Sequence, residues 1–424
     1  MNRAIPNQRR YRIAILNSHP IQYFAPLYRQ LAREPAIDLT VFYCDAGATK
    51  EHFDTGFGRK VQWDVPLLEG YRHEFLANLR NRGPAGPLSL INPAIVQAIR
   101  KGRYDALWIH GYTFATDWLA LRSAIATRTP IFYRSESSLR YDANTRRSPL
   151  LLWVKSRLLL ALFRRVQGFL AIGTDNRNFY LHYGAPPERI FSVPYTVDND
   201  FFRTQADRWR AQRGELRAAI GIGDDDVVFL FAAKMIPLKR PRELLQAFGR
   251  VRRPHNAKLL MVGDGPELAG LREMAAAQGI EGISFTGFAN QSDMPRYYAM
   301  SDVMVRPDGV YKGDWGLTVN EAMAAGLAII ATDQIGATTD LVKSGVNGRV
   351  VHFDDLDELA AAMGLLAADP DAVRRMGEAS REIIRRWSYE QCVDGVLSAL
   401  HSLGGPGSDE RVERSGDRLR RVGP

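Results

Sequence analysis

The chain has 424 residues, of which 46% are apolar and 24% charged, and its formal net charge is +9. This composition is that of a globular protein. The length exceeds what one ordinary hydrophobic core organises, so two domains are expected. The two cysteines, Cys44 and Cys392, lie far apart in the sequence. They exclude a disulfide framework and a cysteine-based zinc site, and such sparse cysteine use fits a reducing compartment.

The basic excess lies wholly in the first half of the chain. Residues 1–200 hold 27 Lys and Arg against 16 Asp and Glu, whereas the remaining residues hold 29 against 31. This asymmetry predicts that the first half meets an anionic partner, such as a membrane surface, a lipid phosphate or a nucleic acid. An Arg-rich solvated face is the alternative. Residues 1–10 contain no apolar run, so no signal peptide is expected there.

Short apolar runs alternate with segments of helical periodicity in the first half. This alternation predicts βαβ units and a parallel sheet. The predicted strands cover 11–17, 38–43, 105–109, 130–133, 168–172 and 190–193, and the predicted helices cover 21–33, 91–101, 114–127 and 150–166. Residues 46–82 show no regular pattern, so we expect a long irregular loop of the kind that often binds ligands.

The segment 150–166 is very apolar, but it carries the basic residues Lys155, Arg157, Arg164 and Arg165. It is too short and too charged for a transmembrane span. Two interpretations remain: a helix packed on the sheet, and an amphipathic helix whose basic side chains meet the headgroups of a bilayer.

The second half repeats the alternation, with predicted strands at 227–232, 258–262, 283–286, 302–305, 327–331 and 349–351. The predicted fold class is therefore α/β, with two Rossmann-like parallel-sheet domains that face a central cleft. The expected boundaries are an N-terminal domain of residues 1–197 completed by a last helix at 388–403, a C-terminal domain of residues 198–387, and a disordered tail of residues 404–424.

The stretch 313–326 lies between two predicted strands and combines a polar loop with a short helix that ends at Gly326. A helix that begins at the carboxyl edge of a parallel sheet binds anions through its free N–H groups and its dipole. Glu321 stands one turn beyond Leu317, where its carboxylate can accept hydrogen bonds from sugar hydroxyls. The combination favours a nucleotide diphosphate-sugar, although an ordinary strand–loop–helix unit with a solvated Glu321 fits the same pattern.

Two further loops follow predicted strands at the same edge. Lys234 and Lys239, five residues apart, can bracket a diphosphate and stabilise the charge that grows on it, or they form a solvated basic loop. The turn with Gly263 and Gly265 can border a nucleotide. It is a weak dinucleotide fingerprint, because Leu268 stands where a third glycine is required, and this disfavours a dehydrogenase.

Together these motifs resemble the family 4 glycosyltransferases, nucleotide-sugar-dependent enzymes of the GT-B fold. The resemblance covers nearly the whole chain and is specific mainly in the second half. The family's basic residue and lysine fall on Lys234 and Lys239, its Gly-Asp-Gly-Pro turn falls on 263–266, and its nucleotide-contacting loop falls on 285–288 with Phe288 at its end. The resemblance implies a donor-binding second domain and an acceptor-binding first domain.

The family's signature of two glutamates separated by seven residues is incomplete here. Glu321 stands at the second position, which implies contact with the ribose hydroxyls, but Gly313 occupies the first and Asp314 follows it. Asp314, or the backbone amides of 314–316, would then face the donor sugar. The resemblance further implies that the residues lining the sugar and the phosphate are Asp314, Gly316, Leu317 and Thr318.

In the first half, His110 resembles the family's strand-end histidine, which reaches toward donor sugar and acceptor. A neutral imidazole there can accept a hydrogen bond from a sugar hydroxyl. The loop 17–22 lacks the family's glycine pair, so His19 and Gln22 are predicted to contribute to acceptor recognition. Glu136 ends another strand at the same edge and is a comparable candidate. A purely structural role is the alternative for each.

The implied reaction is retaining transfer of a sugar from a nucleotide diphosphate-sugar to a hydroxyl acceptor, by front-face substitution without a protein nucleophile. Acidic runs at 224–226 and 354–357 indicate a turn and a helix cap, so neither a metal nor another cofactor is expected. The expected acceptor is a cell-surface polysaccharide or a lipid-linked precursor, and no nucleic-acid partner is expected. The expected location is cytoplasmic, with peripheral contact to an anionic inner membrane face through the basic half.

Two other functions share the same features. A hydrolysing nucleotide-sugar epimerase would have the same fold and diphosphate loops, and it would release nucleotide without an acceptor. A non-catalytic nucleotide-sugar binding protein is compatible with Gly313 at the first signature position.

Overall fold

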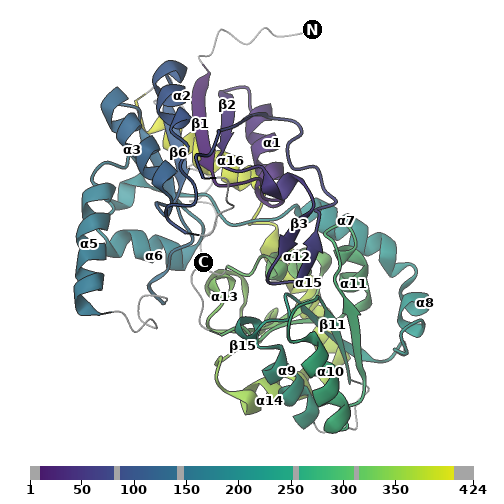
Figure 1. Cartoon of the computed structure of the whole chain (residues 1–424). Coiled ribbons are helices and arrows are strands. Elements are labelled where there is room, and N and C mark those ends of the chain that lie inside the picture. The colour runs from purple at the N-terminus through teal and green to yellow at the C-terminus, as the bar shows by residue number, and fades with distance from the viewer. Residues whose placement is uncertain (1–9, 81–85, 141–147, 252–256, 310–314, 405–424) are drawn as a thin grey trace, which may run out of the picture.

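The computed structural model describes residues 10–80, 86–140, 148–251, 257–309 and 315–404. Within these ranges the chain forms two parallel β-sheets, each with helices on both faces (Figure 1). The predicted α/β class with two Rossmann-like parallel sheets is thus confirmed. None of the described helices combines the length and the apolar character that a membrane crossing requires. The predicted tail begins at Gly404, and the rest of it lies outside the described residues.

The first sheet has seven parallel strands in the order β5-β2-β1-β6-β7-β8-β9. Its central strands are continuous apolar runs because both faces of the sheet are covered, as in β1, where Ile13 to Asn17 are all buried. The seven strands are β1 (Tyr11–Asn17), β2 (Ile37–Tyr43), β5 (Arg72–Phe75), β6 (Ala106–His110), β7 (Ile131–Arg134), β8 (Gly168–Ala171) and β9 (Ile190–Ser192).

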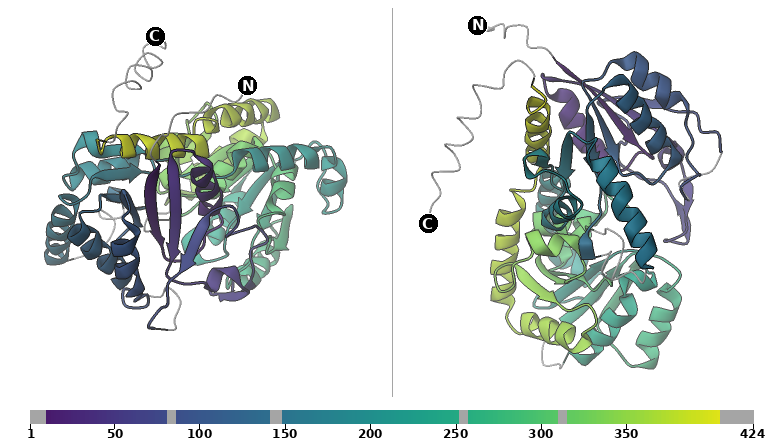
Figure 2. Two further views of the ribbon diagram at one scale, coloured as in Figure 1. Left: turned by 90° about the horizontal axis from the view of Figure 1, so that it is seen from above. Right: turned by 90° about the vertical axis from the view of Figure 1, so that its left-hand side faces the viewer.

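Helices cover both faces of the first sheet, and we call the sheet with these helices the first domain. On one face a buried cluster is formed with α2 (Ala94–Gly102), α3 (Ala115–Thr127), α5 (Pro149–Phe163) and α6 (Thr174–His182). On the other face lie α1 (Phe24–Arg33) and the last helix, α16 (Tyr389–His401). Figure 2 shows α16, in yellow, alongside the purple strands that begin the chain.

The expectation of an irregular loop over residues 46–82 was only partly right, and residues 81 and 82 lie outside the described ranges. This segment contains the short helix η1 (Gly47–Thr49), the antiparallel hairpin of β3 (His52–Asp54) and β4 (Arg59–Val61), and the edge strand β5. These strands are three or four residues long and mostly not buried, so they carry no hydrophobic periodicity. Their pairing partners, and contacts with the second sheet described below, stabilise them instead of an apolar face of their own.

The second sheet has six parallel strands in the order β12-β11-β10-β13-β14-β15, and with its helices it forms the second domain. The strands are β10 (Val227–Ala232), β11 (Ala257–Val262), β12 (Ile283–Gly287), β13 (Val303–Arg306), β14 (Ala328–Thr332) and β15 (Gly348–Val351). The helices are η3 (Pro237–Lys239), α9 (Pro241–Arg250), α10 (Leu268–Ala277), α11 (Met294–Met300), α12 (Leu317–Ala325), α13 (Gly336–Leu341), α14 (Leu356–Ala367) and α15 (Pro370–Ile384).

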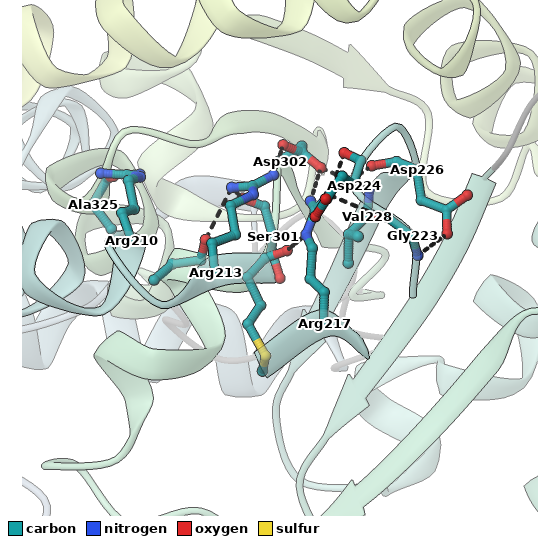
Figure 3. A network of polar contacts seen from close by, with 12 residues as sticks. Arg210, Arg213, Arg217, Gly223, Asp224, Asp226, Val228, Ser301, Asp302 and Ala325 are labelled. Atoms are coloured by element: carbon teal, nitrogen blue, oxygen red, sulfur yellow. Dashed lines mark hydrogen bonds and ion pairs between the residues drawn. The ribbon is translucent and has the colours of Figure 1, made fainter. Parts of the chain in front are cut away.

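Two helices lead into the second domain, α7 (Asn199–Arg210) and α8 (Arg213–Ala218), and a polar network fastens α8 to the amino edge of its sheet (Figure 3). Arg217 is buried and pairs with the Asp302 carboxylate at 2.7 Å. Asp302 also accepts a hydrogen bond from the backbone N–H of Val228, at the start of β10. The acidic run 224–226 forms a turn at this edge, in which Asp226 accepts from the N–H of Gly223 at 2.6 Å.

The chain crosses between the two sheets twice, once before α7 and once before α16. The crossings touch each other, because Thr196 Oγ1 and Asn199 Nδ2 both donate to the carbonyl of Trp387, at 2.6 and 2.9 Å. One buried apolar cluster continues from the α1 and α16 face of the first sheet into the α7 and α12 face of the second. The crossings and this shared core hold the carboxyl edges of the two sheets in a defined relation.

Candidate functional site

Five consecutive strands of the second sheet, β10 to β14, end at one edge, because all of them run parallel in one sheet. Two glycines make this edge compact. A Cβ on Gly263, whose φ is +138°, would stand 1.9 Å from the carbonyl oxygen of Ala233. A Cβ on Gly265, with φ +151°, would stand 2.6 Å from the carbonyl oxygen of Met235. The loops after β10 and β11 therefore pack backbone to backbone, which only glycine permits.

A chain of charged side chains connects η3 to the first turn of α12. Lys239 Nζ donates to Asp308 at 2.7 Å, and the Arg306 guanidinium donates to both oxygens of the same carboxylate at 2.9 and 2.8 Å. Arg306 also donates to the hydroxyl of Thr318. Burial alone would raise the pKa of Asp308, but Arg306 and Lys239 outweigh it and lower that pKa to about 2. The trio of Lys239, Asp308 and Arg306 thus carries one net positive charge next to a helix start.

The helix α12 begins at the edge of the sheet where the sequence placed an anion site. Its N-cap is Gly316 in the left-handed region at φ +83°, where a Cβ would stand 2.7 Å from Ile335 Cγ2. Leu317 and Thr318 form the first turn, whose N–H groups have no carbonyl partner within the helix. Asp314, predicted to face a sugar, lies outside the described residues.

Glu321 lies on the second turn of α12 and is buried. Its carboxylate accepts a hydrogen bond from Tyr298 of α11 at 2.5 Å and one from Tyr23, at the start of α1 in the first domain, at 2.8 Å. Burial raises the pKa of Glu321 to about 7, against the lowering effect of both tyrosines and of Arg306. Glu321 is therefore not solvated, as it would be in an ordinary strand–loop–helix unit. Its hydrogen bond with Tyr23 links the two domains.

The side chain of Lys234, which follows β10 of the second domain, contacts residues of the first domain. Its ammonium lies 2.8 Å from both oxygens of Asp54 at the end of β3, and 4.8 Å from the centre of the Phe57 ring. Phe57 in turn packs edge-on against Phe288, with ring centres 4.9 Å apart. Two residues predicted to contact a donor are thus covered by one hairpin.

The same hairpin makes further contacts along this edge. Arg59 lies 5.1 Å from the centre of the Phe288 ring and 3.5 Å from the Asp264 carboxylate. The carbonyl of Gln62 accepts from Asn290 Nδ2 at 2.7 Å, just beyond β12. Figure 1 shows the β3 hairpin reaching from the first domain to the second. We call residues 52–64 the bridging hairpin.

In the first domain, His110 ends β6 and is enclosed by aromatic rings. Its ring lies 4.8 Å from that of Phe24 and 5.4 Å from that of Trp108, and its Nε2 is 3.2 Å from the Tyr28 hydroxyl. Burial, followed by repulsion from Arg134, holds the pKa of His110 well below its usual value. The imidazole is therefore neutral at physiological pH, which it must be to accept a hydrogen bond from a sugar hydroxyl as predicted.

A cavity of about 270 Å³ lies at the carboxyl ends of β6 and β7. It brings together His110, predicted as a catalytic residue that reaches toward donor sugar and acceptor, and Glu136, a predicted acceptor-side residue. Glu136 is exposed and accepts a hydrogen bond from the Tyr195 hydroxyl at 2.5 Å. The residues that line the cavity are Phe24, His110, Gly111, Tyr112, Thr113, Tyr133, Arg134, Ser135, Glu136, Ser137 and Tyr195.

The other two predicted acceptor-side residues do not line this cavity. His19 and Gln22 lie in the turn between β1 and α1, where Ser18 Oγ is 2.9 Å from His19 Nδ1. Burial, the largest influence, lowers the pKa of His19. The structure thus places them in the first domain, in the turn that precedes α1 and outside the lining of this cavity.

Several polar residues of these sites were not singled out by the sequence. Arg306 and Asp308 could have been found, because Arg306 is the last residue of the buried strand β13 and Asp308 follows two residues later. Tyr23 and Tyr298 lie 298 and 23 residues from Glu321, and Asp54 lies 180 residues from Lys234, so nothing local connects them. Across the described ranges, no three His, Cys, Asp or Glu side chains cluster so that they could hold a metal ion.

Comparison with known proteins places these features in a family context. Residues 212–383 match the family described as glycosyl transferases group 1. The chain is 32% identical over 213 residues to the GDP-mannose-dependent alpha-(1-6)-phosphatidylinositol monomannoside mannosyltransferase of Mycolicibacterium smegmatis, an alignment that covers 48% of this chain and 54% of that protein. It is 28% identical over 226 residues to the D-inositol 3-phosphate glycosyltransferase of Nocardia farcinica, covering 51% and 48%. The chain spans about half the length of these two curated relatives.

Solved structures show the same two-domain fold. Anabaena HepE in complex with UDP has a TM-score of 0.69 at 18% identity, with 92% of this chain and 100% of that one covered. A glycosyltransferase from Rickettsia africae has a TM-score of 0.70 at 16% identity, with 93% and 99% covered. At these identities the likeness establishes the fold, which is GT-B.

Proposed function

We propose that the protein is a retaining glycosyltransferase that moves a sugar from a nucleotide diphosphate-sugar to a hydroxyl acceptor, because residues 212–383 match the family described as glycosyl transferases group 1. The observation that carries the proposal is the chain from Lys239 through Asp308 and Arg306 to Thr318. It joins a fixed positive charge to the amino end of α12 at the carboxyl edge of a parallel sheet, where such folds bind nucleotides.

In this proposal the second domain binds the donor. The diphosphate lies against Lys239, Arg306 and the first turn of α12, while the turn of Gly263 and Gly265 and the Phe288 loop border the nucleotide. As the bond from the anomeric carbon to the diphosphate oxygen breaks, negative charge grows on that oxygen. The acceptor oxygen bonds to the same face of the anomeric carbon, and its proton passes to the departing phosphate oxygen. No protein nucleophile takes part.

These fixed positive charges take the place of a divalent ion in the proposal. Asp308 holds the Lys239 ammonium and the Arg306 guanidinium close together, and its low pKa keeps it ionised as a fixed tether. The two cations then need no reorganisation when the phosphate charge develops. Turnover that survives extensive chelation would support this assignment, and turnover restored only by added Mg²⁺ or Mn²⁺ would contradict it.

Glu321 is proposed to bind the ribose hydroxyls. In this structure one of its oxygens accepts from Tyr23 of the first domain and the other from Tyr298. A ribose hydroxyl can replace the Tyr23 hydroxyl as a donor if α1 moves away from α12. Donor binding would then be coupled to the relative position of the two domains.

The first domain is proposed to bind the acceptor. Neutral His110 and exposed Glu136 line one cavity, and its wall at Tyr195 also touches the second domain, where the Trp315 ring centre lies 6.2 Å away. Trp315 directly precedes Gly316 at the start of α12. This neighbourhood supports transfer between the cavity and the donor loops. The acceptor class proposed is a polysaccharide or lipid-linked glycan precursor, since a relative is named for transfer to a phosphatidylinositol mannoside.

A peripheral site at the cytoplasmic face of a membrane is proposed through α5. The first two turns of this helix leave Leu150, Leu151, Trp153 and Val154 at least 48% exposed. Residues 149–173 contain four basic residues and no acidic one. Exposed apolar side chains, a tryptophan and a basic segment together suit the interface of an anionic bilayer. The interpretation of this segment as packed on the sheet holds for Leu159, Leu162 and Phe163 at its other end.

The decisive experiment measures thermal stabilisation by UDP, GDP, ADP and their sugar conjugates without added metal, followed by product analysis with the donor that binds. Sugar transfer to an added glycan or lipid acceptor supports the proposal. Release of free nucleotide and an isomerised sugar without acceptor would instead identify an epimerase. Stabilisation by a nucleotide-sugar with no turnover would identify a binding protein, and no stabilisation by any of them would remove the donor site.

A further inference from the structure

Arg134 is a buried cation that has no anionic partner among the residues the structure describes. The residue ends β7, is 2% exposed and lines the cavity that also holds His110 and Glu136. Within the described part of the chain its Nη1 has no hydrogen-bond partner, and its Nη2 makes one long contact, 3.5 Å to the carbonyl oxygen of Pro194. A guanidinium carries five N–H donors, so most of its hydrogen-bonding capacity is unused.

The other buried arginines behave differently. Within the described ranges three arginines are buried: Arg134, Arg217 and Arg306. Arg217 pairs with Asp302 at 2.7 Å and Arg306 pairs with Asp308 at 2.8 Å. No carboxylate of the described chain forms an ion pair with Arg134. Because burial of an unpaired charge is costly, this chain's own pattern indicates that Arg134 meets its anion from outside the protein.

The surroundings of Arg134 hold the guanidinium in place without neutralising it. Its central carbon lies 5.2 Å from the Tyr195 ring centre, 5.5 Å from that of Phe24 and 5.7 Å from that of Trp108. Aromatic faces attract a cation, but they offer no lone pair to its N–H groups. They fix the plane of the guanidinium, and a fixed plane favours two-point contact with a planar or tetrahedral oxyanion.

We propose that this cavity binds an oxyanion of the acceptor, a carboxylate or a phosphate, against Arg134. The inference rests on the proposed function in taking the first domain as the acceptor side, and it adds that the acceptor is acidic. The cavity has a polarity that suits such a molecule. Arg134 lies buried at its floor, whereas Glu136 is exposed at its rim, so the anionic group points inward and hydroxyl groups lie toward Glu136.

The test uses small oxyanions as probes. Inorganic phosphate and malonate are titrated into the full-length protein at constant ionic strength by calorimetry, and crystals are soaked in selenate to locate a tetrahedral dianion by its anomalous signal. We expect an anomalous peak beside Arg134, and at least tenfold weaker binding of the preferred anion in Arg134→Met. Arg134→Lys keeps the charge but loses the planar fork, so it should bind more weakly than wild type and more tightly than Arg134→Met.

Phosphate can also bind the cationic side chains of the second domain. The variant Lys239→Met controls for this second site. The anomalous peak beside Arg134 must survive in Lys239→Met. Tighter binding of phosphate would identify a sugar acceptor that carries a phosphate group, and tighter binding of malonate would identify one that carries a carboxylate. If Arg134→Met does not fold, Arg134→Lys and the wild-type soak carry the test. Selenate found only near Lys239, or equal affinities in wild type and in the Arg134 variants, would overturn the inference.

Nucleotide binding measured on the same samples separates the two proposals. Arg134→Met should bind UDP or GDP as wild type does, because Arg134 lies in the first domain. If a nucleotide binds and no anion is found at Arg134, only the acidic acceptor is wrong. If an anion binds at Arg134 and no nucleotide binds anywhere, the proposed glycosyl transfer fails and the oxyanion site stands.

Discussion

The Lys234 ammonium lies 2.8 Å from each carboxylate oxygen of Asp54, although the two residues belong to different domains. Burial raises the pKa of Asp54, but the hydrogen bond from Lys234 and two backbone N–H groups outweigh it, so the carboxylate is held ionised. Asp54 thus pairs with one of the two lysines that the sequence predicted to bracket a diphosphate. An anion that bound Lys234 in place of Asp54 would compete with this contact between the domains.

Asp54→Asn should therefore tighten the binding of UDP or GDP. The substitution keeps the shape of the hairpin and removes the charge that competes for Lys234. Because this ion pair is partly exposed, we expect a gain of roughly two- to fivefold in affinity. Isothermal titration measures it. Glu51→Gln is the matched control, since it removes one carboxylate charge next to the same hairpin, where Glu51 pairs with Lys60 at 2.9 Å. Equal affinities for wild type and Asp54→Asn would show that the hairpin does not compete.

Lys239→Ala should lower the turnover number by about 10²–10³, the scale on which one preorganised charge donor contributes to catalysis. The structure adds a reason, because Lys239 shares Asp308 with Arg306, and its loss leaves Arg306 neutralised by that carboxylate. Lys258→Ala is the control, since Lys258 lies at the start of β11 and pairs with Asp226 at the opposite edge of the same sheet. Near wild-type turnover at saturating donor would remove Lys239 from the mechanism.

Glu321→Gln should change how stability depends on pH. The pKa of Glu321 is raised from 4.5 to about 7 in the folded protein, so between these values the folded state holds a proton that the unfolded state has lost. The stability that Glu321 contributes is therefore present below about pH 4.5 and is lost as the pH rises through 7.

Glutamine does not titrate, so Glu321→Gln should gain on wild type as the pH rises. The relative gain in the free energy of unfolding is on the order of 3 kcal/mol across this window, from the size of the pKa shift. Denaturant unfolding of both proteins at several pH values measures it, and Glu382→Gln at an exposed position controls for the chemical change itself. A stability difference that stays constant from pH 4.5 to 7 would contradict the assignment of a buried, proton-holding carboxylate.

Trp153→Glu should weaken binding to anionic vesicles by about tenfold or more, because it removes a large apolar side chain from the proposed bilayer contact and adds an opposing charge. Trp153 is 58% exposed on α5. Co-sedimentation with phosphatidylserine-containing vesicles at low salt is the measurement. Val346→Glu provides the control, since Val346 is 55% exposed on the second domain. Vesicle binding that is absent in wild type, or lowered equally by both variants, would exclude α5 as the contact.

The second sheet could be predicted well because buried parallel strands are continuous apolar runs. Residues 227–232 are buried throughout and were expected as a strand with the same ends. The helix after β13 could be placed as well, since Gly316 and Gly326 mark its two ends in the left-handed region. Both signals are local, and the sequence alone is enough to recognise them.

The environment of each functional side chain could not be predicted in the same way. Glu321 was expected to face a ligand, and it does lie at the right edge, but its burial depends on Tyr23, which is 298 residues away. Lys234 was expected to contact a phosphate, yet its partner Asp54 stands in a hairpin whose strands are three residues long. Hydrogen bonds between distant residues leave no periodic trace, so they appear only when the two domains are built together.

The return of α16 to the first domain has a consequence for the order of events during synthesis. Helix α16 packs against α1 and β9, and it follows every strand of the second sheet in the chain. While the ribosome is still translating, the face of the first sheet that α16 will cover stays open to solvent. The second sheet has all its strands before the first has its last helix. Domains usually fold in order from the N-terminus, but here the second domain has all its elements before the first does. The nascent chain therefore carries an uncovered apolar face until residues 389–401 emerge.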